Sequence, residues 1–183
     1  MSDQRIAKLF LREVRRDLRP YLRRINRCLG LLSEEQIWWR PNPASNSAGN
    51  LVLHLCGNMR QWIISGLGGA PDARDRDAEF AARGALSRSS AHQKTGSRRA
   101  LLRQLNATER EVEAVLRRLT AWNLARRYTI QGFQVTGLAA VAHVYSHFTY
   151  HGGQIAYLTK LQRGQDLRLT KLPADSRPRR RRS

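Results

Sequence analysis

Three histidines spaced four residues apart lie in one apolar stretch near the C-terminal end of the chain. The stretch from Ala139 to Leu161 reads AAVAHVYSHFTYHGGQIAYLTKL and contains His143, His147 and His151. Residues four apart project from the same face of an α-helix, so the stretch predicts a helix with a row of imidazoles on one side. A single buried histidine is common in a protein core, but several in one core-facing row point to a divalent metal ion.

Three further segments show the apolar period of a helix that faces a core. They are Arg5 to Leu29, residues 47–67 with Ser47 or Asn46 as N-cap, and residues 97–119 with Ser97 as N-cap. Thr136 is the predicted cap of the histidine helix, which ends near Gln162. Four such helices predict an all-α protein built as a four-helix bundle.

The segments between these helices are polar or rich in proline and glycine. Residues 31–50 predict a structured loop, and residues 72–99 predict a long connection with a short helix over residues 73–83. Apolar residues alternate over residues 128–135 on either side of Gln131 and Gly132, which predicts a small hairpin-like crossover before the last helix.

Length and composition indicate one domain. A chain of 183 residues with 41% hydrophobic content can bury one substantial core. We expect a single domain over residues 1–167 and a basic, disordered tail over residues 168–183. No run of about 18 apolar residues and no signal-peptide core are present, so we expect a cytoplasmic protein with no membrane partner. Cys28 and Cys56 are expected to be buried and reduced.

The net charge of +19 raises the question of nucleic-acid binding. The basic residues are distributed along the whole chain, and only the tail, with Arg179 to Arg182, is a dense cluster. A run of like charge at a terminus is usually solvated. We therefore expect no nucleic-acid function, and at most a weak accessory contact through the tail.

Two pairs on the histidine helix have the right spacing for one ion, His143 with His147 and His147 with His151. Gly152 and Gly153 follow His151 directly. Each glycine within a helix costs roughly 1 kcal/mol relative to alanine. This cost indicates a packing or access requirement beside His151, so we assign His147 and His151 as ligands and His143 to a supporting or core position.

The third ligand must come from another helix. His54 is the only other histidine on a core-facing stripe, so it is the predicted third ligand. Three imidazoles leave a coordination position for water or substrate, which is typical of a catalytic metal site. Asn58 and Trp62 lie one and two turns beyond His54, and Gln154 follows three residues after His151; we expect these side chains to line the pocket or support the ligands.

Two stretches also resemble a known family. NSAGNLVLHLCGNMRQWI around His54 and HFTYHGGQIAYLTKL around His147 and His151 are similar to the DinB/YfiT-like superfamily of bacterial metal-binding four-helix bundles. The nearest pattern is that of an uncharacterised branch with His-x-x-x-His-x-Gly-Gln in its last helix. The resemblance covers about residues 5–167 and implies a three-histidine site, a divalent ion such as nickel or zinc, and often a homodimer. Characterised members include thiol-dependent transferases that use bacillithiol or mycothiol, a maleylpyruvate isomerase and proposed hydrolases.

We therefore expect a metal-dependent transferase that uses a low-molecular-weight thiol on a small-molecule substrate. The alternatives are a metal-dependent hydrolase and a metal-binding bundle without catalysis. We expect no acidic side chain on the inner faces of the helices, because Glu13 and Asp17 are predicted to face solvent. The lack of a protein base favours thiolate transfer, in which the sulfur held by the metal is itself the nucleophile.

Overall fold

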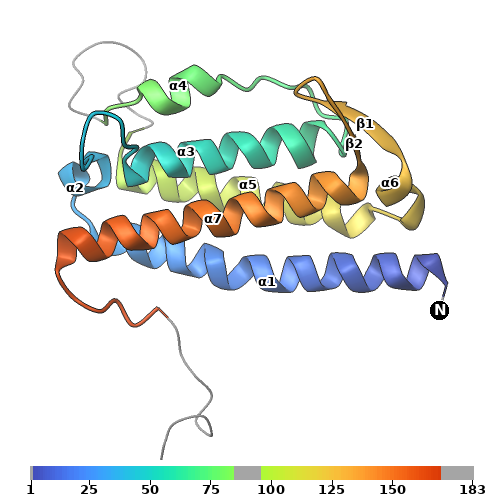
Figure 1. Cartoon of the computed structure of the whole chain (residues 1–183), viewed down its shortest axis with the longest axis horizontal. Helices are drawn as coiled ribbons and strands as arrows, with labels where there is room; N and C mark the ends of the chain where they lie inside the picture. The colour runs from blue at the N-terminus through green and yellow to red at the C-terminus, as the bar shows by residue number, and fades with distance from the viewer. Residues whose placement is uncertain (1, 85–95, 170–183) are drawn as a thin grey trace, which may run out of the picture.

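Four long helices form the body of the protein in the computed structural model, which describes residues 2–84 and 96–169 (Figure 1). They are α1 (Asp3–Leu31), α3 (Ala48–Met59) with its continuation η1 (Arg60–Ser65), α5 (Arg98–Arg118) and α7 (Gly137–Arg163). Around the bundle, α1 packs on α7, α7 on α3, α3 on α5, and α5 on α1. The predicted all-α four-helix bundle is confirmed. None of the described helices combines the length and the apolar character that crossing a membrane requires.

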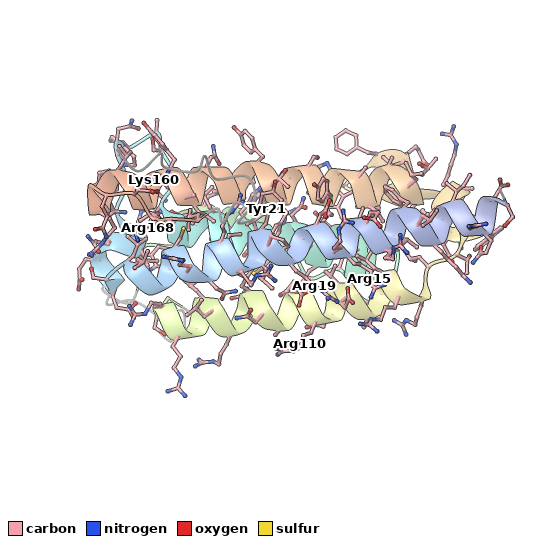
Figure 2. The ribbon with its side chains drawn as sticks, turned by 90° about the horizontal axis from the view of Figure 1, so that it is seen from below. Arg15, Arg19, Tyr21, Arg110, Lys160 and Arg168 are labelled. Atoms are coloured by element: carbon pink, nitrogen blue, oxygen red, sulfur yellow. The ribbon has the colours of Figure 1, made fainter. Side chains whose placement is uncertain are left out.

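The first and third of these helices, α1 and α5, bury one apolar stripe each and carry arginines elsewhere. Arg15 of α1 donates from Nε and Nη2 to Glu113 of α5 at 2.8 and 2.6 Å. Arg19 also contacts Glu113, and Figure 2 shows both arginines where α1 faces α5. The hydrogen bond from Arg15 outweighs the opposing effect of burial and lowers the pKa of Glu113 to about 2. The pair therefore stays ionised at neutral pH and joins the two helices.

In the described residues, three short helices and one hairpin connect the long helices. They are α2 (Glu34–Trp38), α4 (Arg76–Ala81), α6 (Ala121–Ala125), β1 (Arg127–Ile130) and β2 (Phe133–Thr136). The strands are antiparallel, and the two residues between them, Gln131 and Gly132, have φ angles of 52° and 80°. Positive φ angles at both central residues are typical of a type I′ turn, whose twist matches that of the two strands in a hairpin with a two-residue loop. The predicted hairpin and the predicted short helix within residues 73–83 are confirmed, whereas α6, capped by Thr120, was not expected.

Some predictions fall outside the described residues. These are the Arg-rich end of the tail, residues 170–183, and the middle of the long connection, residues 85–95, which includes His92. Within the described part of the chain, Leu167 follows the end of α7 and is buried in the core.

The two adjacent glycines of α7 do not serve a close helix contact in the described chain. A Cβ atom at Gly152 would lie 3.7 to 3.9 Å from Ile25 and Tyr21 of α1, which is an ordinary contact distance. A Cβ atom at Gly153 would meet no heavy atom within 4 Å. The packing requirement expected beside His151 is therefore not found. The assignment of His147 and His151 as ligands, which this expectation favoured, is consistent with the close approach of the two rings.

We expect Gly153→Ala to raise the free energy of unfolding by about 0.5 to 1 kcal/mol, because alanine has the higher helix propensity and the added methyl group has space. Gly164→Ala is the matched contrast. Gly164 ends α7 with a φ of 61°, so its replacement should lower stability. Urea unfolding measures both variants. A loss of stability in Gly153→Ala would mean that residue 153 packs against something outside the described chain.

Candidate metal centre

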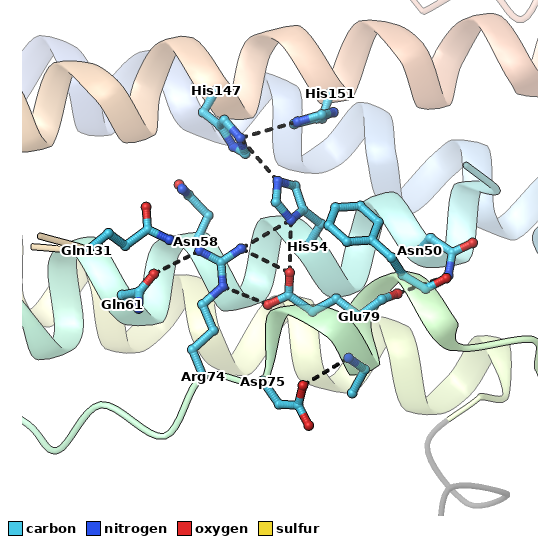
Figure 3. A network of polar contacts seen from close by, with 12 residues as sticks. Asn50, His54, Asn58, Gln61, Arg74, Asp75, Glu79, Gln131, His147 and His151 are labelled. Carbon is cyan, nitrogen blue, oxygen red and sulfur yellow. Dashed lines mark hydrogen bonds and ion pairs between the residues drawn. The ribbon is translucent and has the colours of Figure 1, made fainter. Parts of the chain in front are cut away.

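Three imidazoles from two helices converge at one point between α3 and α7 (Figure 3). The Nε2 atom of His147 lies 3.2 Å from Nε2 of His54 and 3.3 Å from Nε2 of His151. His147 and His151 are one turn apart on α7, and His54 reaches them from α3. The structure thus brings together the three residues that the sequence predicts as a ligand set.

The geometry of these nitrogen atoms suits a divalent ion. In a tetrahedral zinc site with Zn–N bonds of about 2.05 Å, neighbouring nitrogen atoms are about 3.3 Å apart. Two of the separations have this value, and one ligand atom from each of the three histidines lies within 4.8 Å of the others. Three Nε2 atoms that face one point cannot all be satisfied by hydrogen bonds to one another, because each bond needs one donor and one acceptor. The histidine cluster is therefore compatible with metal binding.

The start of α3 determines where His54 points. Ser47 and Asn50 form a capping box, in which each side chain bonds the backbone of the other residue. His54 follows Asn50 by four residues, so both lie on the same face of α3. Asn50 Nδ2 also donates to the carbonyl oxygen atoms of Glu79 and Ala82 at 2.9 and 3.0 Å, which ties α4 to that face.

On its far side, His54 contacts an acidic residue that the sequence interpretation missed. Nδ1 of His54 lies 2.8 Å from Oε2 of Glu79, which is only 8% exposed. The expectation that no acidic side chain faces inward is therefore wrong. Glu79 belongs to α4, a six-residue helix too short for periodicity to reveal its buried face. Glu79 precedes Phe80, whose ring lies 4.7 Å from that of His54. Phe80 is the one aromatic residue of the polar segment of residues 72–99, and it was the available signal.

Arg74 completes the contacts around Glu79. Its Nε and Nη2 atoms donate to the two carboxylate oxygen atoms at 2.7 and 2.9 Å. Burial alone would raise the pKa of Glu79, but the hydrogen bonds from Arg74 and His54 hold this pKa below its usual value. Glu79 is therefore ionised and can only accept hydrogen bonds.

The tautomer of His54 follows from this arrangement. Nη2 of Arg74 also lies 3.1 Å from Nδ1 of His54, but Arg74 can only donate and Glu79 can only accept. A shorter contact to an ionised carboxylate requires the proton on Nδ1. In the neutral form of the ring Nε2 is then unprotonated, and Nε2 is the atom that faces His147.

His143 belongs to a neighbouring cluster. Its ring stacks on Trp62 at 3.9 Å, and Nδ2 of Asn58 lies 3.1 Å from its Nε2. Trp62 lies in η1, where the helix widens into a π-helix, and its indole N–H donates to Gln131 at the hairpin tip at 3.2 Å. The ring of His143 is 5.4 Å from that of His147. Asn58, Trp62 and His143 therefore form a polar and aromatic wall beside the three converging histidines.

Gln154 supports the other end of the row. Its Oε1 atom lies 2.6 Å from Nδ1 of His151, so the ring donates from Nδ1 and turns an unprotonated Nε2 towards His147. Tyr150 is close to both residues: its hydroxyl group accepts from Nε2 of Gln154, and its ring lies 5.0 Å from that of His151. This is the supporting contact that the spacing of Gln154 predicts.

The converging imidazoles on α7 are neutral at physiological pH. Burial, followed by repulsion from the neighbouring imidazoles, lowers the pKa of His147 to about 3. Burial also lowers the pKa of His151, against a smaller opposing effect of its hydrogen bond with Gln154. The Nδ1 atom of His147 is buried without a hydrogen-bond partner in the described part of the chain. Neutral rings keep the lone pairs that a metal ion needs.

The fold is that of the DinB-like helical bundles. A DinB-like protein from Bacillus cereus ATCC 10987 is 16% identical to this chain and superimposes with a TM-score of 0.60. The match covers 83% of this chain and 91% of that chain. The DinB-like protein YjoA from Bacillus subtilis is 19% identical to this chain and superimposes with a TM-score of 0.59. The match covers 88% of this chain and 96% of that chain. At these identities the likeness shows the fold alone.

The chain belongs to the family described as a protein of unknown function, DUF1572, whose model matches residues 5–176. The DinB-like fold that the sequence resemblance implies is confirmed by these solved structures. No curated protein matches the sequence.

The metal-free protein should lose stability as the pH falls from about 7 towards 5. The unfolded chain takes up protons at imidazoles near pH 6.5, whereas folding lowers the pKa of His147 to about 3. The unfolded state therefore binds more protons between these values, and each such group contributes a slope of up to about 1.4 kcal/mol per pH unit. Urea unfolding with a chelator at several pH values measures the slope. His147→Gln should flatten it, and an unchanged slope would contradict a neutral His147.

Proposed function

We propose that this protein is a metal-dependent enzyme in which His54, His147 and His151 hold a divalent ion such as nickel or zinc. The observation that carries the proposal is the convergence of three Nε2 atoms from two helices. His147 and His151 are only partly buried, so a small molecule can approach from their side. Three ligands leave room for such a molecule at the ion, as in catalytic zinc sites.

The reaction class proposed is transfer by a low-molecular-weight thiol. The chemistry that a divalent ion supplies is Lewis acidity, which lowers the pKa of a thiol or water molecule beside it. The protein's own thiols are poorly placed for this role: Cys28 and Cys56 are buried, and complete burial raises the pKa of Cys56 to about 12. Glu79 is engaged by Arg74 and His54 and is not free to act as a base. A nucleophile supplied by a separate thiol needs neither group.

A metal-dependent hydrolase is the second candidate, and His143 is the observation that favours it. Burial, and then the charge of Arg74, lowers the pKa of His143, so the imidazole is neutral at pH 7. A neutral imidazole next to the centre is a possible proton acceptor for water. Its Nε2 atom lies against the Asn58 amide, so this role requires Asn58 to move or a substrate to replace the contact.

The proposed substrate is a small molecule bound beside the histidines. Asn58, Trp62 and His143 lie on one side of the three rings, and Gln154 and Tyr150 on the other. These groups offer amide, hydroxyl and aromatic contacts to a polar ligand. The expected homodimer, the cytoplasmic location and the weak contact of nucleic acid with the tail stay predictions.

We expect the purified protein to contain about one divalent ion per chain, and His54→Ala, His147→Ala and His151→Ala each to lose it. Elemental analysis at neutral pH measures the content and identifies the metal. His143→Ala is the matched control, because it removes an imidazole from the same helix without removing a proposed ligand. Equal metal content in wild type and all three ligand variants would disprove the site.

Turnover should depend on both the metal and an added thiol. The metal-loaded protein is incubated with bacillithiol, mycothiol or glutathione and a panel of electrophiles, and consumption of the free thiol is followed. We expect thiol consumption that His147→Ala abolishes. Ester or amide cleavage without thiol would select the hydrolase instead, and metal binding without turnover in either assay would indicate a non-catalytic bundle.

A further inference from the structure

The segment of residues 70–84, here called the strap, crosses the outside of α3 and carries Arg74 and Glu79. Polar contacts attach it at both ends. Ser65 Oγ donates to the carbonyl oxygen of Pro71 at 3.0 Å, and Gln61 Nε2 donates to Asp72 at 2.7 Å. At the other end Asn50 holds the carbonyl oxygen atoms of Glu79 and Ala82. A cavity of about 770 Å³ lies between the strap, α3 and α5, and α4 packs on α3 beside it.

The ion pair in the strap is buried to an extent that stability alone does not explain. The side chains of Arg74 and Glu79 are 3% and 9% exposed. Removing two charges from water costs about as much as their attraction returns, so a buried pair is weak evidence of a stabilising role. The pair instead presents one carboxylate oxygen to Nδ1 of His54 at 2.8 Å (Figure 3).

We propose that the strap is the positioning device of the metal centre: Glu79 fixes the tautomer and orientation of His54, and Arg74 fixes Glu79. This inference rests on the proposed function. A carboxylate behind a ligating imidazole keeps the proton on the far nitrogen atom and the lone pair on the near one. Arg74 balances the charge of Glu79, so the carboxylate acts here as an oriented acceptor.

A glycine on α3 makes room for this contact. A Cβ atom at Gly57 would lie 1.8 Å from Oε1 of Glu79 and 2.9 Å from Nε of Arg74. Any side chain at position 57 must therefore displace the carboxylate that is held by Arg74 and His54. Gly57 lies inside a helix, where glycine is otherwise unfavourable. The position offers a way to move Glu79 without removing a charge.

The first test compares the affinity of Glu79→Ala and wild type for added Zn²⁺, measured by competition with a chelating dye. We expect Glu79→Ala to bind roughly 10- to 100-fold more weakly, which is the usual effect of losing such a supporting carboxylate. Glu111→Ala is the matched control: Glu111 pairs with Arg60 at the same cavity, but the pair is half exposed and does not contact His54. The control should bind as wild type.

The second test separates position from charge with Gly57→Ala. We expect Gly57→Ala to weaken Zn²⁺ binding in the wild-type background and to have little effect in the Glu79→Ala background, where the carboxylate that it would displace is absent. Unfolding by urea establishes that each variant is folded. Equal effects in both backgrounds would show that Gly57 acts on the helix and not through Glu79, which would overturn the proposal.

The third test reads the tautomer of His54 in metal-free protein from long-range ¹H–¹⁵N correlation spectra. Wild type should carry the proton on Nδ1. In Glu79→Ala the neighbour of Nδ1 is Arg74, a donor, so the proton should move to Nε2. Unchanged tautomer and unchanged Zn²⁺ affinity would overturn the proposal while leaving the metal site intact. If wild type binds no metal, the proposed function fails, and the tautomer alone decides whether Glu79 positions His54.

Discussion

The packing of α3 against α7 places the Nε2 atoms of three histidines at one point, and much of the structure near this point serves to keep them there. Unpaired polar atoms at a helix interface are costly, so their arrangement requires support from each side. His54 is supported by Glu79, and His151 by Gln154. His147 occupies the middle, and its buried Nδ1 atom has no partner in the described chain. It is held by the packing of α7 and by its two neighbours.

Acidic residues are scarce in this chain, with 14 against 33 lysines and arginines, so the places where they are buried or partly buried carry information. Glu113 accepts hydrogen bonds from arginines of both α1 and α5 and joins these helices along the side away from the histidines. Glu79 accepts from Arg74 and joins a short connecting segment to the site. The first contact links two long helices, and the second orients a side chain.

Much of the fold and the convergence of the three histidines could be predicted from the sequence because both depend on regular helices. Thr136 and Ser47 cap the two helices that carry the histidines, and a period of 3.6 then determines which residues share a face. Glu79 could not be placed in this way, because α4 has fewer than two turns and its orientation depends on tertiary contacts with Asn50 and Arg74. The π-helical turn that brings Trp62 over His143 was also not predictable, since a change of helix pitch leaves no periodic signal over six residues.

In the hairpin between α6 and α7, one residue accepts an unfavourable backbone conformation and makes a side-chain hydrogen bond that a shorter residue could not make. Gln131 adopts a left-handed conformation that glycine or asparagine would adopt more readily. Its amide oxygen nevertheless accepts the indole N–H of Trp62. Asparagine would relax the turn but is one methylene group shorter, and glycine has no acceptor to offer. Through this hydrogen bond, Gln131 connects the turn before α7 to the indole ring that stacks on His143 of α7. The unfavourable backbone conformation of one turn residue is therefore coupled to the position of an aromatic side chain next to the histidines.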